Sequence, residues 1–260
     1  MEQSRSLIYA ENLAKMEKYI SKASKAHADV IVFPEGFMFY YGMNDSLKER
    51  SEKSEPVDGP FVKEVSKQAR NYGINVVFGM NEKVTNELRT YNTTLTIGRS
   101  GEVIDIYRKT HLYDAFNMKE SEKNIPSNNE LKVYDVEGFK IGTIVCYEVR
   151  FPEMARTLAL KGVEILIVPS AWVKGYNKED NWLSVIKTRA MENTIYVGTS
   201  NQIGNIYTGI SSFVDPLGII LSRANEQEGM IFGTASKERL SYAMDLLPLI
   251  HQRNTEVYDL

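Results

Sequence analysis

Residues 139–172 read FKIGTIVCYEVRFPEMARTLALKGVEILIVPSAW, and this stretch indicates the fold class. The apolar runs at 139–145 and 164–168 have the length of buried strands. Between them, residues 152–161 have the pattern of a helix, with Pro152 at its start and Gly162 just past its end. A strand, a helix and a second strand in this order predict an α/β fold.

The rest of the chain alternates in the same way and adds hairpins. Helices are expected at 12–26, 60–72 and 182–192, and strands at 29–33, 74–80, 91–97, 102–107, 195–200 and 230–235. Turn residues at 98–101 and 215–218 predict hairpins, whereas the polar stretches 48–58 and 121–130 are expected to be surface loops. Such a mixture is typical of mixed sheets covered by outer helices.

Two distant segments of the chain resemble each other. Residues 22–37 and 158–172 both contain a helix end, a tight turn, a buried strand and a proline. We infer two similar halves that pack together, each a sheet with helices on its outer face. Convergence on a common helix–strand design is the alternative.

The composition excludes several classes of protein. Of 260 residues, 43% are hydrophobic and 25% are charged, which excludes disorder over the whole length. The net charge of −3 gives no reason to expect a nucleic-acid partner. The apolar runs are too short to span a membrane and the N-terminus is polar, so neither a membrane span nor a signal peptide is expected. A cytoplasmic location is the expectation.

Cysteine and histidine usage argues against metal and cofactor sites. Cys146 is the only cysteine, which excludes an internal disulfide and a multi-cysteine metal site. His27, His111 and His251 lack the spacing of metal ligands, and the sequence has no glycine-rich phosphate loop. We therefore expect no cofactor and no metal.

Polar residues that follow the expected strands are candidates for catalysis, because ligand sites in α/β proteins lie beyond the carboxyl ends of strands. Cys146 follows one strand and precedes the helix at 152–161, as nucleophile elbows do. Its thiol needs a base or a cation nearby, and Glu35 and Lys109 follow two other strands. A papain-like pair of Cys146 with His111 is a rival arrangement. A buried structural cysteine, a surface carboxylate and a surface lysine are the non-catalytic alternatives.

Four segments resemble the nitrilase superfamily of carbon–nitrogen hydrolases and occur in its order: ADVIVFPEGF, IGRSGEVIDIYRKTHLYDAF, FKIGTIVCYEVRFPEMARTLALKGVEILIVPSAW and RAMENTIYVGTSNQIG. The resemblance implies a four-layer αββα sandwich of two mixed sheets, formed by a single domain over residues 1–260. It also implies a Glu–Lys–Cys triad, here Glu35, Lys109 and Cys146. The family has a second glutamate, which Glu120 matches, with Glu122 as the nearby competitor.

The resemblance further implies a reaction. Cys146 would form a thioester with a small linear amide, which is thereby hydrolysed to a carboxylate plus ammonia. The family's amidase branches have tyrosine after the cysteine and its true nitrilases have tryptophan, so Tyr147 favours an amide substrate. The alternatives are a nitrile substrate, an N-carbamoyl substrate, and a catalytically silent binding or scaffold protein of the same fold.

Six residues that follow or flank the catalytic segments are candidates for substrate binding: Tyr41, Phe116, Tyr147, Arg150, Trp172 and Asn201. For Phe116 and Trp172, a place in the core or at an interface is the alternative. Arg150 either binds a substrate carboxylate or pairs with Glu148 or Glu153.

The two chain ends carry further expectations from the resemblance. Family members usually open with a β-strand that has no counterpart here, so we expect the first strand to be missing. In the family, the C-terminal tail, here about residues 241–260, reaches a second subunit. This implies a homodimer or a higher homo-oligomer.

Overall fold

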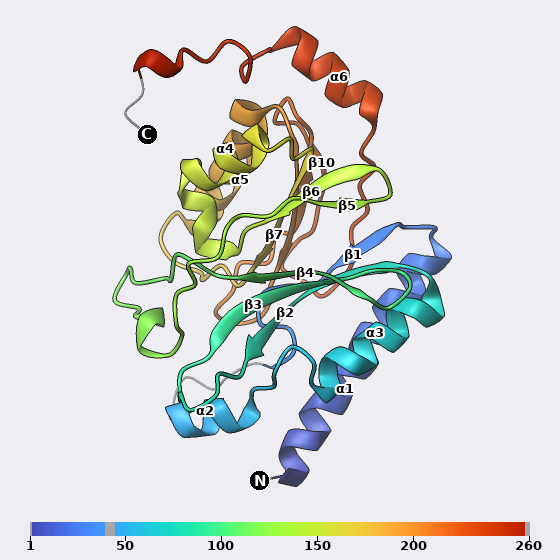
Figure 1. Ribbon diagram of the computed structural model, residues 1–260, viewed down its shortest axis with the longest axis vertical. Coiled ribbons are helices and arrows are strands. Elements are labelled where there is room, and N and C mark those ends of the chain that lie inside the picture. Colours follow the sequence, from blue (N-terminus) through green and yellow to red (C-terminus); the bar gives the residue numbers. More distant parts are fainter. Residues whose placement is uncertain (1, 40–44, 258–260) are drawn as a thin grey trace.

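The computed structural model describes residues 2–39 and 45–257. Its α-helices lie on the outside of two sheets (Figure 1). They are α1 (Glu2–Lys25), α2 (Leu47–Lys53), α3 (Pro60–Tyr72), α4 (Pro152–Leu160), α5 (Lys178–Asn193) and α6 (Lys237–Leu246). Three short 3₁₀ helices are η1 (Glu120–Glu122), η2 (Cys146–Arg150) and η3 (Thr255–Val257).

The described strands form two mixed sheets. The first has the order β1-β2-β3-β4, with only β1 and β2 parallel. The second has the order β10-β9-β8-β7-β6-β5, with β6, β7 and β8 parallel. The bounds are β1 (Val30–Val32), β2 (Asn75–Glu82), β3 (Tyr91–Ile97), β4 (Val103–Arg108), β5 (Tyr134–Val136), β6 (Phe139–Thr143), β7 (Ile165–Ser170), β8 (Tyr196–Asn201), β9 (Ser212–Val214) and β10 (Ile220–Arg223).

The two sheets face each other and each carries helices on its outer side (Figure 1). One apolar core lies between α1, α3 and the first sheet, and another between α4, α5 and the second sheet. A third cluster joins the sheets themselves, with Val77 of the first sheet packed among Tyr134, Ile141 and Ile167 of the second. The four-layer αββα sandwich of mixed sheets, expected from the sequence, is therefore confirmed.

The expected helix at 60–72 has the predicted bounds because both of its ends are specified locally. Pro60 occupies the first helical position, where its missing N–H costs nothing. Gly73 ends the helix with φ +62°, a left-handed conformation that glycine adopts without strain. The first helix differs from expectation at its start, since α1 begins at Glu2 rather than residue 12.

Two expectations for the fold are wrong. The stretch 48–58, expected to be a loop, contains α2, which begins with a capping box formed by Ser46 and Glu49. Residues 230–235, expected to be a strand, have no regular secondary structure. A strand requires a neighbouring edge with which to form hydrogen bonds, and the described partner of β10 is β9 alone. The apolar residues at 230–235 were therefore not sufficient to predict a strand.

None of the helices in the described part of the chain combines the length and the apolar character needed to cross a membrane.

The hydroxyl of Tyr134 links the two sheets and provides a test of their packing. It lies 3.0 Å from Thr96 Oγ1 of β3 and 2.8 Å from Thr143 Oγ1 of β6. We expect Tyr134→Phe to lower the free energy of unfolding by about 1–3 kcal/mol, because buried threonine hydroxyls lose a partner. Urea unfolding measures this change. Tyr176→Phe, at a side chain that is 99% exposed, is the control and should change stability by less than about 0.5 kcal/mol. Equal effects of the two substitutions would contradict the proposed link.

Candidate active site

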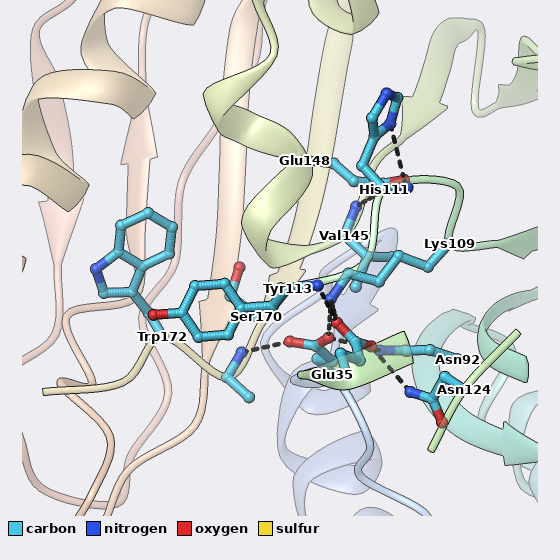
Figure 2. A network of polar contacts seen from close by, with 12 residues as sticks. Glu35, Asn92, Lys109, His111, Tyr113, Asn124, Val145, Glu148, Ser170 and Trp172 are labelled. Carbon is cyan, nitrogen blue, oxygen red and sulfur yellow. Dashed lines mark hydrogen bonds and ion pairs between the residues drawn. The ribbon is translucent and has the colours of Figure 1, made fainter. Parts of the chain in front are cut away.

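The side chain of Lys109 lies at the centre of a buried cluster of charges (Figure 2). Lys109 directly follows β4, and its side chain is 2% exposed. Its Nζ atom lies 2.9 Å from Glu35 Oε1 and 2.9 Å from Glu120 Oε2. Burial opposes the positive charge, but the two carboxylates outweigh burial and raise the pKa of Lys109 well above its usual value. Lys109 is therefore an ammonium ion throughout the physiological pH range.

Glu35 is buried just beyond β1 and is held from several sides. Its Oε1 also accepts a hydrogen bond from Asn92 Nδ2, at 2.7 Å. Its Oε2 accepts from the backbone N–H of Ala171, which follows β7, at 2.8 Å. The carboxylate thus connects the ends of strands from both sheets, and its position is fixed by the docking of one sheet on the other.

Gly79 of β2 permits the close approach of the Glu35 segment. A Cβ atom at Gly79 would lie 2.4 Å from the backbone nitrogen of Gly36 and 2.8 Å from Glu35 Cα. The N–H of Gly79 donates to the carbonyl of Pro34, and its carbonyl accepts from the N–H of Met38. Any larger residue at this position would displace the Glu35 carboxylate.

Cys146 begins η2, between β6 and α4, and is buried. It has φ +48°, a left-handed conformation that a residue other than glycine adopts at a cost of about 1–2 kcal/mol. The strand–turn–helix bend expected for a nucleophile elbow is present here. Burial and the Glu35 charge raise the pKa of the Cys146 thiol, while Lys109 and the N–H of Ala171 act in the opposite direction. The raised pKa favours a protonated sulfur at neutral pH.

Of the two glutamates considered from the sequence, Glu120 is the one that contacts Lys109. Besides Lys109, its carboxylate accepts hydrogen bonds from Tyr113 N at 2.7 Å, Asn124 Nδ2 at 2.9 Å and Asn92 Nδ2 at 3.0 Å. Burial would raise the pKa of Glu120, but the Lys109 charge and these donors lower it overall. The competitor, Glu122, is exposed.

Glu148, a residue to which the sequence assigned no role in the site, connects the lysine segment to the cysteine segment. Its Oε1 accepts from the backbone N–H groups of Thr110 at 2.7 Å and His111 at 3.1 Å. Its Oε2 accepts from the hydroxyl of Tyr107 at 2.8 Å and from the N–H of Val145 at 2.7 Å. One buried carboxylate therefore fixes the residues next to both Lys109 and Cys146.

The rival residue His111 has other contacts. Its Nδ1 lies 2.8 Å from the hydroxyl of Thr110, and its ring packs against Phe151 with centroids 4.1 Å apart. Its backbone N–H belongs to the Glu148 network. These contacts give His111 a structural place in the segment after β4 and provide no support for a Cys146–His111 pair.

A small pocket opens beside Cys146. Its lining consists of Tyr113, Cys146, Tyr147, Arg150, Ala171, Trp172, Val173 and Lys178. Three of the residues predicted to bind substrate are thus in the lining: Tyr147, Arg150 and Trp172. Within the described residues, Arg150 forms no ion pair with Glu148 or with Glu153, the two partners considered from the sequence.

The other three predicted substrate-binding residues lie elsewhere. Phe116 is 67% exposed, and its ring contacts Lys178 from outside the lining. Asn201 is buried and supports Trp172, because its Oδ1 accepts from the Trp172 N–H at 2.9 Å. Tyr41 lies outside the described residues.

Lys178 and Asn92 were not identified from the sequence. The candidates were sought among residues that follow a strand. Lys178 begins α5, and Asn92 lies near the start of β3, so neither residue meets this criterion. Within the described residues, no group of three or more His, Cys, Asp or Glu side chains is arranged to hold a metal ion.

Comparison with known proteins gives a consistent result. The family model described as carbon–nitrogen hydrolase matches residues 2–241. Deaminated glutathione amidase from Escherichia coli O157:H7 is 29% identical over 246 residues, which cover 95% of this chain and 92% of the relative. 2-Oxoglutaramate amidase from Bacillus subtilis (strain 168) is 28% identical over 254 residues, covering 96% and 93%. A carbon–nitrogen hydrolase structure from Helicobacter pylori G27 has a TM-score of 0.87 at 22% identity, covering 96% and 92%.

The Glu148 network can be tested through its dependence on pH. Burial would raise the pKa of Glu148, but the hydrogen bonds it accepts lower it below the ordinary value of 4.5. Stability from such a group is complete above its ordinary pKa and is lost as pH falls through the folded-state pKa. We expect Glu148→Gln to cost roughly 3 kcal/mol at pH 7, because an amide turns N–H groups toward backbone donors. The difference from the unmodified protein should shrink below about pH 4.5.

Urea unfolding between about pH 3 and pH 7 measures this difference. Glu153→Gln, at an exposed position on α4, is the matched control and should show little effect at any pH. A penalty for Glu148→Gln that stays constant down to about pH 3 would show that the network does not depend on the charge of the carboxylate.

Proposed function

The chain belongs to the carbon–nitrogen hydrolase family and is an amidase, and we propose that Cys146 is its nucleophile, with Glu35 as general base and Lys109 as oxyanion-binding cation. The observation that carries this proposal is the buried Glu35–Lys109–Glu120 cluster next to the strained cysteine. The substrate we propose is a small linear amide, which the enzyme converts to a carboxylate and ammonia.

The first step requires a proton acceptor for the thiol. Glu35 takes the proton of Cys146 as the sulfur attacks the carbonyl carbon of the amide, and a C–S bond forms while the carbonyl oxygen becomes an oxyanion. The fixed position of the Glu35 carboxylate, with Lys109 and Asn92 on one oxygen and Ala171 on the other, supports this role. The raised pKa of Cys146 makes such a base necessary.

The oxyanion then needs donors in a fixed arrangement. An ammonium group has three N–H donors, and Glu35 and Glu120 occupy two on Lys109, so one remains for the substrate oxygen. Tyr147 is the second residue of η2, where backbone N–H groups have no partner within the helix, and its N–H is the second donor. Each donor of this kind typically lowers the barrier by about 3–4 kcal/mol.

Collapse of the tetrahedral intermediate breaks the C–N bond. Glu35 returns its proton to the leaving nitrogen, ammonia departs, and the acyl group remains on Cys146 as a thioester. Glu35 next accepts a proton from water as the water attacks the thioester. The C–S bond breaks, the thiol regains its proton and the carboxylate product leaves. Glu120 holds Lys109 in position during both steps.

The same side chains could attack a nitrile or an N-carbamoyl group, so the choice of an amide rests on other observations. Relatives that align over nearly the whole chain are named as amidases for deaminated glutathione and for 2-oxoglutaramate. Tyr147 lines the pocket directly after the nucleophile, where the amidase branches have tyrosine. We also propose a cytoplasmic location, which suits a chain with one buried cysteine and no disulfide.

Ammonia release from a panel of small amides, nitriles and N-carbamoyl compounds tests the reaction. We expect Cys146→Ala to fold normally and to show no turnover above background, and Glu35→Gln and Lys109→Met to lower kcat at least 1,000-fold. Mass spectrometry after a rapid acid quench should detect an acyl group on Cys146. Substantial turnover by pure Cys146→Ala would refute the covalent step. Release of ammonia from nitriles alone would favour the nitrilase alternative.

We further propose that the chain forms a homodimer through a C-terminal apolar patch, which we define as Tyr242, Met244, Leu246, Leu247, Leu249 and Val257. Each of these side chains is at least 36% exposed. They belong to α6 and the segment after it, which extends beyond α4 and α5 in Figure 1. Several large apolar side chains left exposed along one segment are typical of an interface.

Light scattering tests the dimer. The unmodified chain should have twice the single-chain mass of 29.6 kDa, and Leu246→Glu should shift it toward the single-chain mass because a buried carboxylate opposes association. Leu88→Glu, at a side chain that is 49% exposed and lies outside the patch, is the control and should leave the mass unchanged. A single-chain mass for the unmodified protein would end this proposal.

A further inference from the structure

The amide side chain of Asn92 bridges two carboxylates of the buried charge cluster (Figure 2). Its Nδ2 atom lies 2.7 Å from Glu35 Oε1 and 3.0 Å from Glu120 Oε1. An amide nitrogen has two N–H groups, and an ionised carboxylate only accepts hydrogen bonds, so each N–H is committed to one glutamate. Asn92 therefore contacts both carboxylates, as Lys109 does.

The backbone of Asn92 lies opposite that of Lys109. β3 and β4 are antiparallel, with Thr93 opposite Arg108, so the next pair in the same register is Asn92 with Lys109. The carbonyl of Asn92 accepts a hydrogen bond from the N–H of Lys109 at 2.9 Å. Side chains of directly opposed residues project to the same face, which places the amide beside the ammonium group. One residue of β3 thus holds the main chain of Lys109 and both of its carboxylate partners.

Asn92 also determines which oxygen of Glu35 is turned toward the sulfur. Asn92 and Lys109 both donate to the same oxygen, Oε1. The other oxygen, Oε2, accepts from the N–H of Ala171. This N–H and the Glu35 side chain both act on the Cys146 thiol, so the thiol lies on the Oε2 side of the carboxylate. A rotation of the carboxylate would break both hydrogen bonds to Oε1.

The charge balance of the cluster gives the amide a second effect. Two carboxylates share the ammonium group of Lys109, and a neighbouring negative charge favours uptake of a proton by a carboxylate. Asn92 opposes this uptake with two charge-assisted hydrogen bonds and adds no charge of its own. Its hydrogen bond is one of the contacts that lower the pKa of Glu120. The other titratable groups around the cluster are Cys146 and Glu148 of η2 and Tyr113 in the segment after β4.

We propose that Asn92 is a positioning residue of the amidase reaction, which ties the carboxylates of Glu35 and Glu120 to Lys109 and keeps Oε2 of Glu35 turned toward the thiol. The inference rests on the proposed function, in which Glu35 is the base. The lining of the pocket beside Cys146 does not include Asn92, so the amide acts through the two glutamates. Its loss should therefore slow the chemical step and leave substrate binding nearly unchanged.

Asn92→Leu tests this role, because it removes both N–H donors, keeps a side chain of similar size and adds no charge. For the fastest amide of the panel, we expect kcat to fall about 100-fold and KM to change less than about threefold, since a displaced base slows the reaction of a substrate that still binds. The acidic limb of the pH profile of kcat/KM should move upward by about one pH unit, because one of the two carboxylates then takes up a proton at a higher pH. An acidic limb at the same pH as in the unmodified enzyme would overturn the proposal.

A matched control separates this role from a general loss of stability. Asn75 is a buried amide at the start of β2, and its Nδ2 donates to the carbonyl of Asp29 at 2.8 Å and to Glu137 Oε1 at 3.4 Å. Asn75→Leu should lower the urea midpoint as Asn92→Leu does, but leave kcat and the acidic limb unchanged. An equal movement of the limb in both variants would contradict a specific role of Asn92.

A second variant covers the case in which Asn92→Leu does not fold. Asn92→Asp keeps the shape of the side chain, removes both N–H donors and adds a third carboxylate to the cluster. Its acidic limb should also lie at a higher pH than that of the unmodified enzyme. An unchanged limb in this variant would overturn the proposal.

Alkylation of Cys146 tests the proposal without turnover. Iodoacetamide reacts with the thiolate, and Cys146 is the only cysteine, so the mass of the intact protein reports the reaction. The rate should fall at low pH, where Glu35 no longer accepts the thiol proton, and this fall should begin about one pH unit higher in Asn92→Leu. If no amide released ammonia, the proposed function would fail, and this measurement would still decide the role of Asn92. Identical alkylation profiles would overturn that role.

Discussion

The site depends on the ammonium group of Lys109, which is buried between two carboxylates. Removing an ammonium ion from water costs several kcal/mol, and this cost is offset only when the partners are placed at hydrogen-bonding distance. Glu35 and Glu120 provide this, each 2.9 Å from Nζ. Burial, and after it the charge of Glu35, raise the pKa of the Cys146 thiol, while the charge of Lys109 lowers it.

The rest of the molecule holds these groups in place. Glu35 follows a strand of the first sheet and accepts a hydrogen bond from Ala171, which follows a strand of the second. Glu148 performs a similar function between the segments that contain Lys109 and Cys146. Both carboxylates are buried and multiply bonded, so the geometry of the site is a direct product of the packing of the two sheets.

Features specified by local sequence were predictable, and features that depend on tertiary neighbours were not. The helix at 60–72 was correct because proline and glycine specify its ends, and β3 had the predicted bounds of 91–97. The expected strand at 230–235 was wrong because its existence depends on an adjacent edge. In the site, Glu35, Lys109 and Cys146 could be identified because each follows a strand. Lys178 could not, because it begins a helix and lines the same pocket as Arg150 only in the folded chain.

The division of the site between two sheets has a consequence for biogenesis. Glu35, the proposed base, belongs to the N-terminal half of the chain, and Cys146, the proposed nucleophile, belongs to the C-terminal half. During synthesis the first half emerges from the ribosome before Cys146, with the inner face of its sheet uncovered. The proposed catalytic groups therefore meet only when the second half packs on the first, and a chain arrested midway lacks the proposed nucleophile.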